Sequence, residues 1–354
     1  LDFARRTLQR LCLSAGDVVL SWARSDGDTE QVASPLLGIA EGADVVADTA
    51  DPGWFARGWT GSASCVPLQP DPAPKVTSGE TLFGGAYTVQ LMREEPFAAF
   101  VSGRLGVASL ERFQPGLSAR QRGNVLHDAL HRLLASKPSQ SQLAAWDSKA
   151  RATRVEESAW RAINEMSRHA DEVLRLLLHL EKQRLQQLLQ DFLDHELQRD
   201  DFRIDALEQK LELEVGNICL NLRIDRIDRL PDDSLLIADY KSGSRKPFMN
   251  RKLNAPAHIQ LSVYAKALDG HVGGLALINI DSREISYQGE GGSISFGRIK
   301  PDDWPEALQR WCAEVDTLLV RLGEGDIGVN QAQSADQARP LALLSRLEEL
   351  RRDR

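Results

Sequence analysis

The most constraining feature of this sequence is a change in the spacing of its apolar residues near residue 200. Between residues 141 and 200, apolar residues recur at the three- and four-residue spacing of one helix face: Leu174, Leu177, Leu178, Leu185, Leu188, Leu189, Phe192 and Leu193. From Leu207 onward, apolar and polar residues alternate instead, as in half-buried strands. Two turns, at 216–217 and 231–234, divide this part into three strands that end near Lys241. The sequence therefore predicts long helices, then an antiparallel meander, then a helix at about 257–268.

Two features upstream divide the rest of the chain. Ser118 precedes a stretch with helical periodicity that Pro138 ends. Gly123 lies inside that predicted helix, where glycine costs about 1 kcal/mol relative to alanine, so it indicates a close approach of another element or a helix start. Residues 67–79 contain four prolines and few apolar side chains. We therefore predict a first segment at 1–66, a linker at 67–80 and a main domain at 81–354.

Composition excludes several classes of protein. The chain has 354 residues, enough for about two domains, and its net charge of −8 excludes a protein that is basic over its whole surface. A local basic stripe would still suffice for binding nucleic acid. No apolar run approaches the ~20 residues of a membrane span, and the first residues lack the apolar centre of a signal peptide. We expect no membrane association and a cytoplasmic location, and the absence of an initial methionine suggests a piece of a longer protein.

The four cysteines give a further constraint. They are widely scattered, with no C-x-x-C pair: Cys12, Cys65, Cys219 and Cys312. This pattern disfavours a disulfide framework and a structural zinc site, and it is typical of a reducing compartment.

Acidic residues and a lysine gather where the predicted strands end. Residues two apart in a strand share a face, so Asp239 and Lys241 point together while Tyr240 points away. Asp225 and Asp228 are three apart, so in a regular strand only one of them can face the same site. Two carboxylates and a lysine at adjacent strand ends suit Mg²⁺ and a phosphate substrate. Taken alone, such residues are more often surface ion pairs.

Four blocks of sequence, in order, carry a resemblance to a known family. They are Arg122-Gly123-Asn124-Val125-Leu126-His127, Ile224-Asp225-Arg226-Ile227-Asp228, Asp239-Tyr240-Lys241-Ser242-Gly243 and Gln260-Leu261-Ser262-Val263-Tyr264. Together they resemble the motifs of the PD-(D/E)XK nuclease superfamily, and specifically its RecB/AddB-type nuclease domain. The resemblance implies an α/β fold with a restriction-endonuclease-like core, in which helices flank a central mixed sheet. Residues 141–200 would then be a large helical insertion.

The resemblance also assigns catalytic roles. Asp225 and Asp239 would be metal ligands, Lys241 the catalytic lysine, and His127 the histidine that completes the metal site from its helix. Taken alone, His127 is typical of a helix histidine with an ordinary partner. The family also has a glutamate on the preceding strand. Glu208, Glu212 and Glu214 share a face and compete for this role, and the alignment of the strand favours Glu208.

Other residues would contact DNA or pair locally. Gln260 and Tyr264, one helical turn apart, would lie near the DNA, although they also suit an ordinary helix face. Arg122, Arg245 and Lys246 would add positive charge around the acidic pocket, as phosphodiester binding requires. Asp228 would pair with a neighbouring arginine.

The sequence departs from the family in two ways. Many AddB-type domains hold an iron–sulfur cluster with four cysteines, but Glu95 and Ser345 stand at the first and last of those positions, so we expect no cluster. Residues 1–66 loosely resemble the end of an inactivated helicase-like domain, with an opening helix and a strand at 18–22. No Walker A motif is present in the sequence.

These observations predict a metal-dependent DNA nuclease module that uses Mg²⁺ or Mn²⁺. The resemblance implies exonucleolytic action in recombinational DNA repair, with DNA and a helicase–nuclease subunit as partners. The alternative is a catalytically weak, nuclease-like module that binds DNA or a helicase. The missing cluster cysteines and the partial N-terminus favour the alternative, whereas the intact set of His127, Asp225, Asp239 and Lys241 favours the enzyme.

Overall fold

The computed structural model describes residues 2–16, 18–20, 22, 25–26, 28–39, 73–80, 82–108, 116–167, 171–243, 247–281 and 283–329. The chain divides into two units, residues 1–69 and 70–354. The first unit contains helix α1 (Asp2–Cys12), the short paired strands β1 (Ser25–Asp26) and β2 (Thr29–Glu30), and the 3₁₀ turn η1 (Pro35–Ile39). The strand predicted at 18–22 is wrong for its described residues, which are not in a strand. Val19 is 91% exposed and Trp22 is 48% exposed, so these apolar residues are not buried as the prediction requires.

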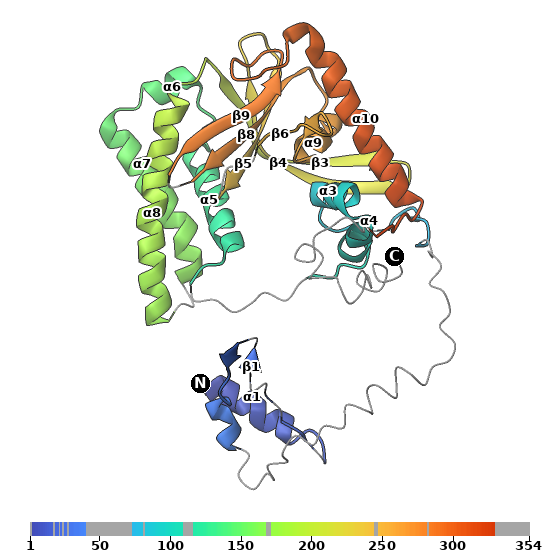
Figure 1. Cartoon of the computed structure of the whole chain (residues 1–354). Coiled ribbons are helices and arrows are strands. Elements are labelled where there is room, and N and C mark those ends of the chain that lie inside the picture. Colours follow the sequence, from blue (N-terminus) through green and yellow to red (C-terminus); the bar gives the residue numbers. More distant parts are fainter. Residues whose placement is uncertain are drawn as a thin grey trace. The chain divides into compact units, whose positions relative to one another are not determined.

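A mixed sheet of five strands forms the centre of the second unit (Figure 1). Its strands are β3 (Arg203–Val215), β4 (Ile218–Arg229), β5 (Leu235–Ser242), β8 (Val272–Ile280) and β9 (Ile285–Gly291), in that spatial order. The first three form the predicted antiparallel meander. β5 and β8 are parallel, and helix α9 (Gln260–Ala267) connects them, as a parallel crossover requires. The predicted α/β fold with a mixed central sheet is therefore confirmed.

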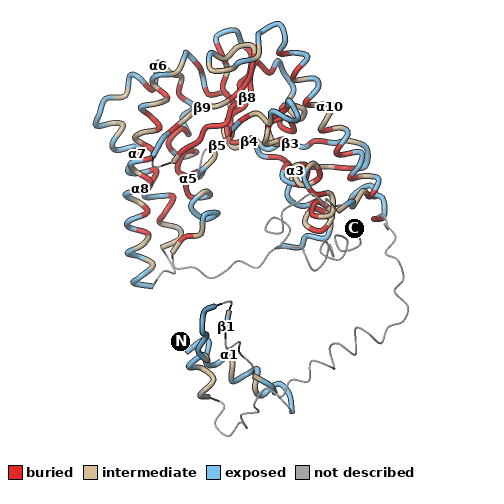
Figure 2. Tube along the Cα trace, viewed as in Figure 1, coloured by how far each residue is buried: buried red, intermediate tan, exposed pale blue. Residues whose placement is uncertain are grey.

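Helices cover both faces of this sheet. Helices α3 (Ala86–Glu94), α9 and α10 (Trp304–Gly323) share one hydrophobic core with the sheet, and α5 (Ala119–Leu133), α7 (Ser148–Ser167) and α8 (Glu172–Glu196) share the other. The shorter elements are α4 (Pro96–Ala98), the π-helix η2 (Ala99–Arg104), α6 (Gln140–Ala144), η3 (Pro301–Asp303), β6 (Met249–Asn250) and β7 (Ala255–Pro256). Figure 2 shows the buried strands between the two helical layers. The predicted apolar stripe of α8 supplies Leu185, Leu189 and Phe192 to its core.

Helix α5 begins and packs as its sequence indicates. The Ser118 side chain accepts the backbone N–H of Gln121, and the Gln121 side chain accepts the backbone N–H of Ser118, which forms a capping box. A Cβ at Gly123 would lie 3.2 Å from Ser242 Oγ at the end of β5. Gly123 therefore marks a close approach, and it lets α5 pass directly beside the end of this strand.

The predicted linker differs in part from the structure. Ala73 and Val76 donate their backbone N–H groups to the carbonyls of Gly325 and Gly323, at 3.0 and 2.8 Å. Both residues are buried, because the apolar side chains between the prolines pack beside the end of α10. Residues 73–80 thus belong to the second unit, whereas 67–72 lie outside the described residues. No helix in the described part of the chain is long and apolar enough to cross a membrane.

Candidate active site

The site forms where strands β4 and β5 separate. Their antiparallel ladder runs from the pair Arg229–Leu235 to the pair Arg226–Ala238. Just beyond it, Asp225 Oδ2 accepts the backbone N–H of Tyr240 at 2.9 Å. Side chains along β4 normally alternate between the two faces of the sheet, and this alternation shifts at the same place. Ile224 and Ile227 lie in one core although they are three residues apart. This shift turns the buried Asp225 carboxylate toward β5.

Glu208 lies opposite Asp225 on the neighbouring strand. The pairs Leu207–Arg226 and Gln209–Ile224 flank this position in the β3–β4 ladder. Glu208 has a positive φ of 50°, in the left-handed region that glutamate seldom occupies. Its carboxylate pairs with Arg223 Nε at 2.8 Å. The two other candidate glutamates lie farther along β3, opposite Asn221 and Cys219.

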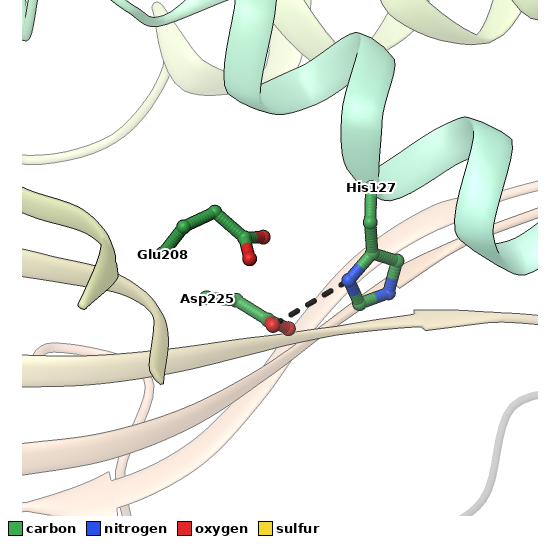
Figure 3. A group of neighbouring side chains, drawn as sticks. All are labelled: His127, Glu208 and Asp225. Carbon is green, nitrogen blue, oxygen red and sulfur yellow. Dashed lines mark ion pairs between the residues drawn. The ribbon is translucent and has the colours of Figure 1, made fainter. Parts of the chain in front are cut away.

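His127 reaches the same place from α5 (Figure 3). Its Nε2 lies 3.1 Å from the Tyr240 carbonyl oxygen. A carbonyl can only accept, so Nε2 carries the proton of this hydrogen bond. The other ring nitrogen, Nδ1, lies 3.4 Å from Asp225 Oδ1 and can offer a lone pair to a cation when the ring is neutral.

Asp239 and Lys241 point together, as strand parity predicts. Lys241 Nζ lies 2.5 Å from Asp239 Oδ2 and donates to Gln260 Oε1 at 3.0 Å. Gln260 Nε2 in turn donates to the Tyr264 hydroxyl at 2.5 Å. Tyr264 is only 4% exposed, so this part of α9 does not present a broad face to solvent. Instead, the hydrogen bonds from Tyr264 through Gln260 to Lys241 hold the lysine in place.

The crowding of negative charge shifts three pKa values. Burial and the charge of Asp225 raise the pKa of Asp239 to about 6, despite Lys241. Burial, helped by Asp225 and opposed by Arg223, also raises the pKa of Glu208. Burial alone would lower the pKa of His127, but the hydrogen bond and charge of Asp225, with Asp239 and Glu208, raise it. These carboxylates therefore favour a neighbouring positive charge.

The residues fit a divalent cation. One ligand atom each from His127, Glu208 and Asp225 lies within 4.8 Å of the others. Asp239 is 1% exposed, and its Oδ2 has no hydrogen bond of normal geometry beside the ion pair with Lys241. Carboxylate oxygens suit Mg²⁺, and the imidazole nitrogen is better tolerated by Mn²⁺. The three grouped residues include Glu208, whereas the ligand set implied by the resemblance included Asp239 in its place. A ligand role for Asp239 stays a prediction.

The remaining predicted residues are placed as follows. Arg122 is half exposed on α5, and its Nε lies 3.4 Å from Glu181 of α8. Arg245 and Lys246 lie outside the described residues. Asp228 accepts from Arg226 Nε at 2.6 Å, which is the predicted pairing with a neighbouring arginine. DNA contact by Arg122, Gln260 or Tyr264 stays a prediction.

Sequence reasoning missed a buried charge network behind the site. The Arg226 side chain is fully buried between Asp228 and Glu196 of α8, with Nη2 2.7 Å from Glu196. Arg199 bonds to the same two carboxylates, and the Tyr287 hydroxyl donates to Glu196. The two-residue spacing of Arg226 and Asp228 predicts a shared face. Nothing in the sequence pairs Glu196 with a strand residue thirty positions away.

Fold and site together define an α/β domain of nuclease type, with a cation-compatible group of side chains at a strand fork. The model of the PD-(D/E)XK nuclease superfamily matches residues 86–336, and the chain belongs to this superfamily. Membership implies a nuclease, that is, a hydrolase of phosphodiester bonds. No curated protein matches the chain. Among solved structures, the protein SSO0001 is similar at 15% identity over 66% of this chain and 87% of its own. The TM-score between the two structures is 0.20.

Proposed function

We propose that this chain is a metal-dependent DNA nuclease that uses Mg²⁺ or Mn²⁺. The observation that carries the proposal is the convergence of Asp225, Asp239, Lys241, His127 and Glu208 at one strand fork. Ion pairing alone does not account for this cluster, because Lys241 pairs with Asp239 and Arg223 with Glu208, which leaves the buried Asp225 beside His127. Membership of a nuclease superfamily supports the phosphodiester bond as the target.

Four residues would hold the cation: His127, Glu208, Asp225 and, from the adjoining strand, Asp239. When bound, the cation would polarise a phosphate oxygen and lower the pKa of a bound water. The protein orients the imidazole, because its Nε2–H is fixed on the Tyr240 carbonyl and only Nδ1 faces the carboxylates.

Lys241 is placed to act on the substrate. Its ammonium has three N–H donors, of which one points to Asp239 and one to Gln260. The third remains for a phosphate oxygen or for a water that attacks the phosphorus, and the side chain is one-third exposed. The Asp239 ion pair and the Gln260–Tyr264 chain fix where this donor points.

The finer parts of the proposal come from the RecB/AddB-type resemblance. It supports exonucleolytic cleavage, recombinational repair, a helicase–nuclease partner and a cytoplasmic location. The helicase-like origin of residues 1–66 is part of the same proposal. The absence of an iron–sulfur cluster is also proposed, because Glu95 occupies the first cysteine position. Anaerobic purification followed by a visible spectrum and iron and sulfide assays tests this, and stoichiometric iron and sulfide would contradict it.

The decisive experiment measures cleavage of labelled linear DNA with Mn²⁺ or Mg²⁺. Asp239→Asn should lower the rate at least about 100-fold, because a charged group that stabilises the reaction is lost. Asp233→Asn is the matched control, since Asp233 is an exposed turn aspartate with φ of 66°, a conformation that asparagine adopts readily. Wild-type cleavage that persists in EDTA would refute metal dependence. A wild type that binds DNA but does not cut it would support the weak binding module instead.

A further inference from the structure

An exposed arginine that the catalytic assignment does not use stands at the edge of the site. Arg223 lies two residues before Asp225 on β4, and its side chain is 62% exposed. Its Nε contacts Glu208, one of the three residues grouped for a cation. Arg223 therefore faces both the site and solvent.

A second basic group surrounds Glu181 of α8. This carboxylate is buried, with a side chain only 6% exposed. Arg184 contacts both of its oxygens through Nε, at 3.0 and 3.1 Å, and Arg122 approaches to 3.4 Å. Two guanidinium groups thus share one carboxylate, which leaves a net positive charge. Both arginines are partly exposed, at 54% for Arg122 and 37% for Arg184.

The fold places these two groups on opposite sides of the site. Arg223 lies beside β3 through its contact with Glu208. Arg122 adjoins Gly123, which touches Ser242 at the end of β5. Arg184 contacts the same carboxylate of α8 as Arg122, so the two arginines form one group.

The spacing suits a nucleic-acid backbone. Arg223 contacts Glu208 of β3, and Arg122 lies beside the end of β5, so in the order β3-β4-β5 the Asp225 carboxylate lies between the two arginine groups. The two strand intervals from β3 to β5 span roughly 10 Å, or about three stacked nucleotides at 3.4 Å each. Arginine is suited to this role because its planar fork binds phosphate through two hydrogen bonds.

We propose that one DNA strand lies across this edge of the sheet, with its phosphates bound by Arg223 on one side of the carboxylates and by Arg122 and Arg184 on the other. The proposal rests on the proposed nuclease function, because that function makes a polynucleotide the ligand of the site. Glu181 holds Arg122 and Arg184 in place before the strand binds, and Glu208 holds Arg223 until a cation takes that carboxylate.

Binding of a fluorescein-labelled single-stranded DNA, followed by anisotropy with Mn²⁺ at several salt concentrations, tests the proposal. A Lys241→Met background prevents cleavage. Arg223→Gln and Arg122→Gln should each weaken binding about tenfold, since each removes a charged hydrogen bond. Each should also lower the slope of log affinity against log salt by about 0.7. Arg203→Gln, an exposed arginine on β3 about five residues from Glu208, should change neither quantity.

Mn²⁺ binding to the same variants, measured by calorimetry without DNA, separates phosphate binding from an indirect effect. Arg223→Gln should leave Mn²⁺ affinity unchanged or tighter, because the arginine and the cation compete for Glu208. The double variant Arg184→Gln/Glu181→Gln removes Arg184 without leaving the buried carboxylate poorly paired, and it should also weaken DNA binding.

The outcomes are distinguishable. If only one arginine group affects the salt slope, or if Arg223→Gln loses Mn²⁺ affinity, the proposed strand path is wrong. If the slopes change only with duplex DNA, a single strand is the wrong ligand. If the wild type binds DNA through both groups but never cuts it, the strand path stands and the nuclease function fails.

Discussion

Asp225 accepts the backbone N–H of Tyr240 at 2.9 Å, immediately beyond the last residue pair of the β4–β5 ladder. The carbonyl of the same tyrosine accepts from His127. Both backbone polar groups of Tyr240 are thus used by side chains of the site. A carboxylate and an imidazole take over hydrogen bonds at the place where the two strands part, and this arrangement fixes both side chains against the backbone.

The two site tyrosines should respond differently to loss of their hydroxyls. Tyr240→Phe should keep activity within about twofold, because the site uses its backbone amide and carbonyl, whereas its buried hydroxyl lies by Arg226 and has no hydrogen bond of normal geometry among the described residues. Tyr264→Phe removes the acceptor of the Gln260 amide and should lower kcat about tenfold, since Gln260 orients Lys241. Steady-state kinetics on both purified variants checks this, and equal kcat values would contradict the positioning of Lys241 through Gln260.

Removal of the site imidazole should weaken metal binding. His127→Ala should lower Mn²⁺ affinity about tenfold or more, because it removes the nitrogen that faces Asp225. His179→Ala is the matched control, because His179 is an exposed histidine of α8 whose ring contacts Gln183 and which is absent from the group of candidate ligands. Calorimetric titration with Mn²⁺ measures both. Comparable losses in the two variants would contradict a ligand role for His127.

The stability that protonated Asp239 contributes to the metal-free protein should be lost as pH rises from about 4 to about 6. Burial and Asp225 raise the pKa of Asp239 to about 6, so the folded protein holds this proton more tightly than the unfolded chain, whose aspartates titrate near 3.9. The raised pKa of His127 acts in the same direction at higher pH, because the stability it contributes is lost as the ring deprotonates. Chemical unfolding of wild type and Asp239→Asn tests this, since the stability of the wild type relative to the variant should decrease between pH 4 and 6.

Metal binding should show the opposite dependence on pH. A cation requires Asp239 and His127 without their protons, so Mn²⁺ should raise Tm more at about pH 7.5 than at about pH 5.5. Thermal unfolding at both pH values, with and without Mn²⁺, measures this difference. An equal increase at the two values would argue that the raised pKa groups do not bind the ion.

The network behind the site should be important for folding. Arg226→Met leaves two buried carboxylates that share one guanidinium, Arg199, and should cost about 3–5 kcal/mol of unfolding free energy. Arg229→Met is the matched control on the same strand, where the arginine pairs with Asp205 and Asp233 near the surface, and its effect should be much smaller. Urea unfolding compares them. A similar loss for both would mean that the buried network adds little stability.

The sequence predicted much of the second unit, for identifiable reasons. The alternation of apolar and polar residues predicted the antiparallel meander. The two-residue separation of Asp239 and Lys241 along a strand placed both side chains on one face. The strand at 18–22 was wrong because apolar content cannot show whether a strand has a partner. The second half of the predicted linker belongs to the domain, because composition does not reveal the backbone hydrogen bonds of Ala73 and Val76 to the end of α10.

The sequence by itself determined the helical and strand periodicities and the spacing of the motif residues, because these depend on local backbone geometry. Only the tertiary structure decided that His127, about a hundred residues before Asp225, faces it, since the close packing of α5 on β5 at Gly123 sets that distance. It also decided which of the three glutamates on one face of β3 lies opposite Asp225, because the β3–β4 register puts Glu208 there. Strand parity specifies a face but not a neighbour, and neighbours depend on how distant segments pack.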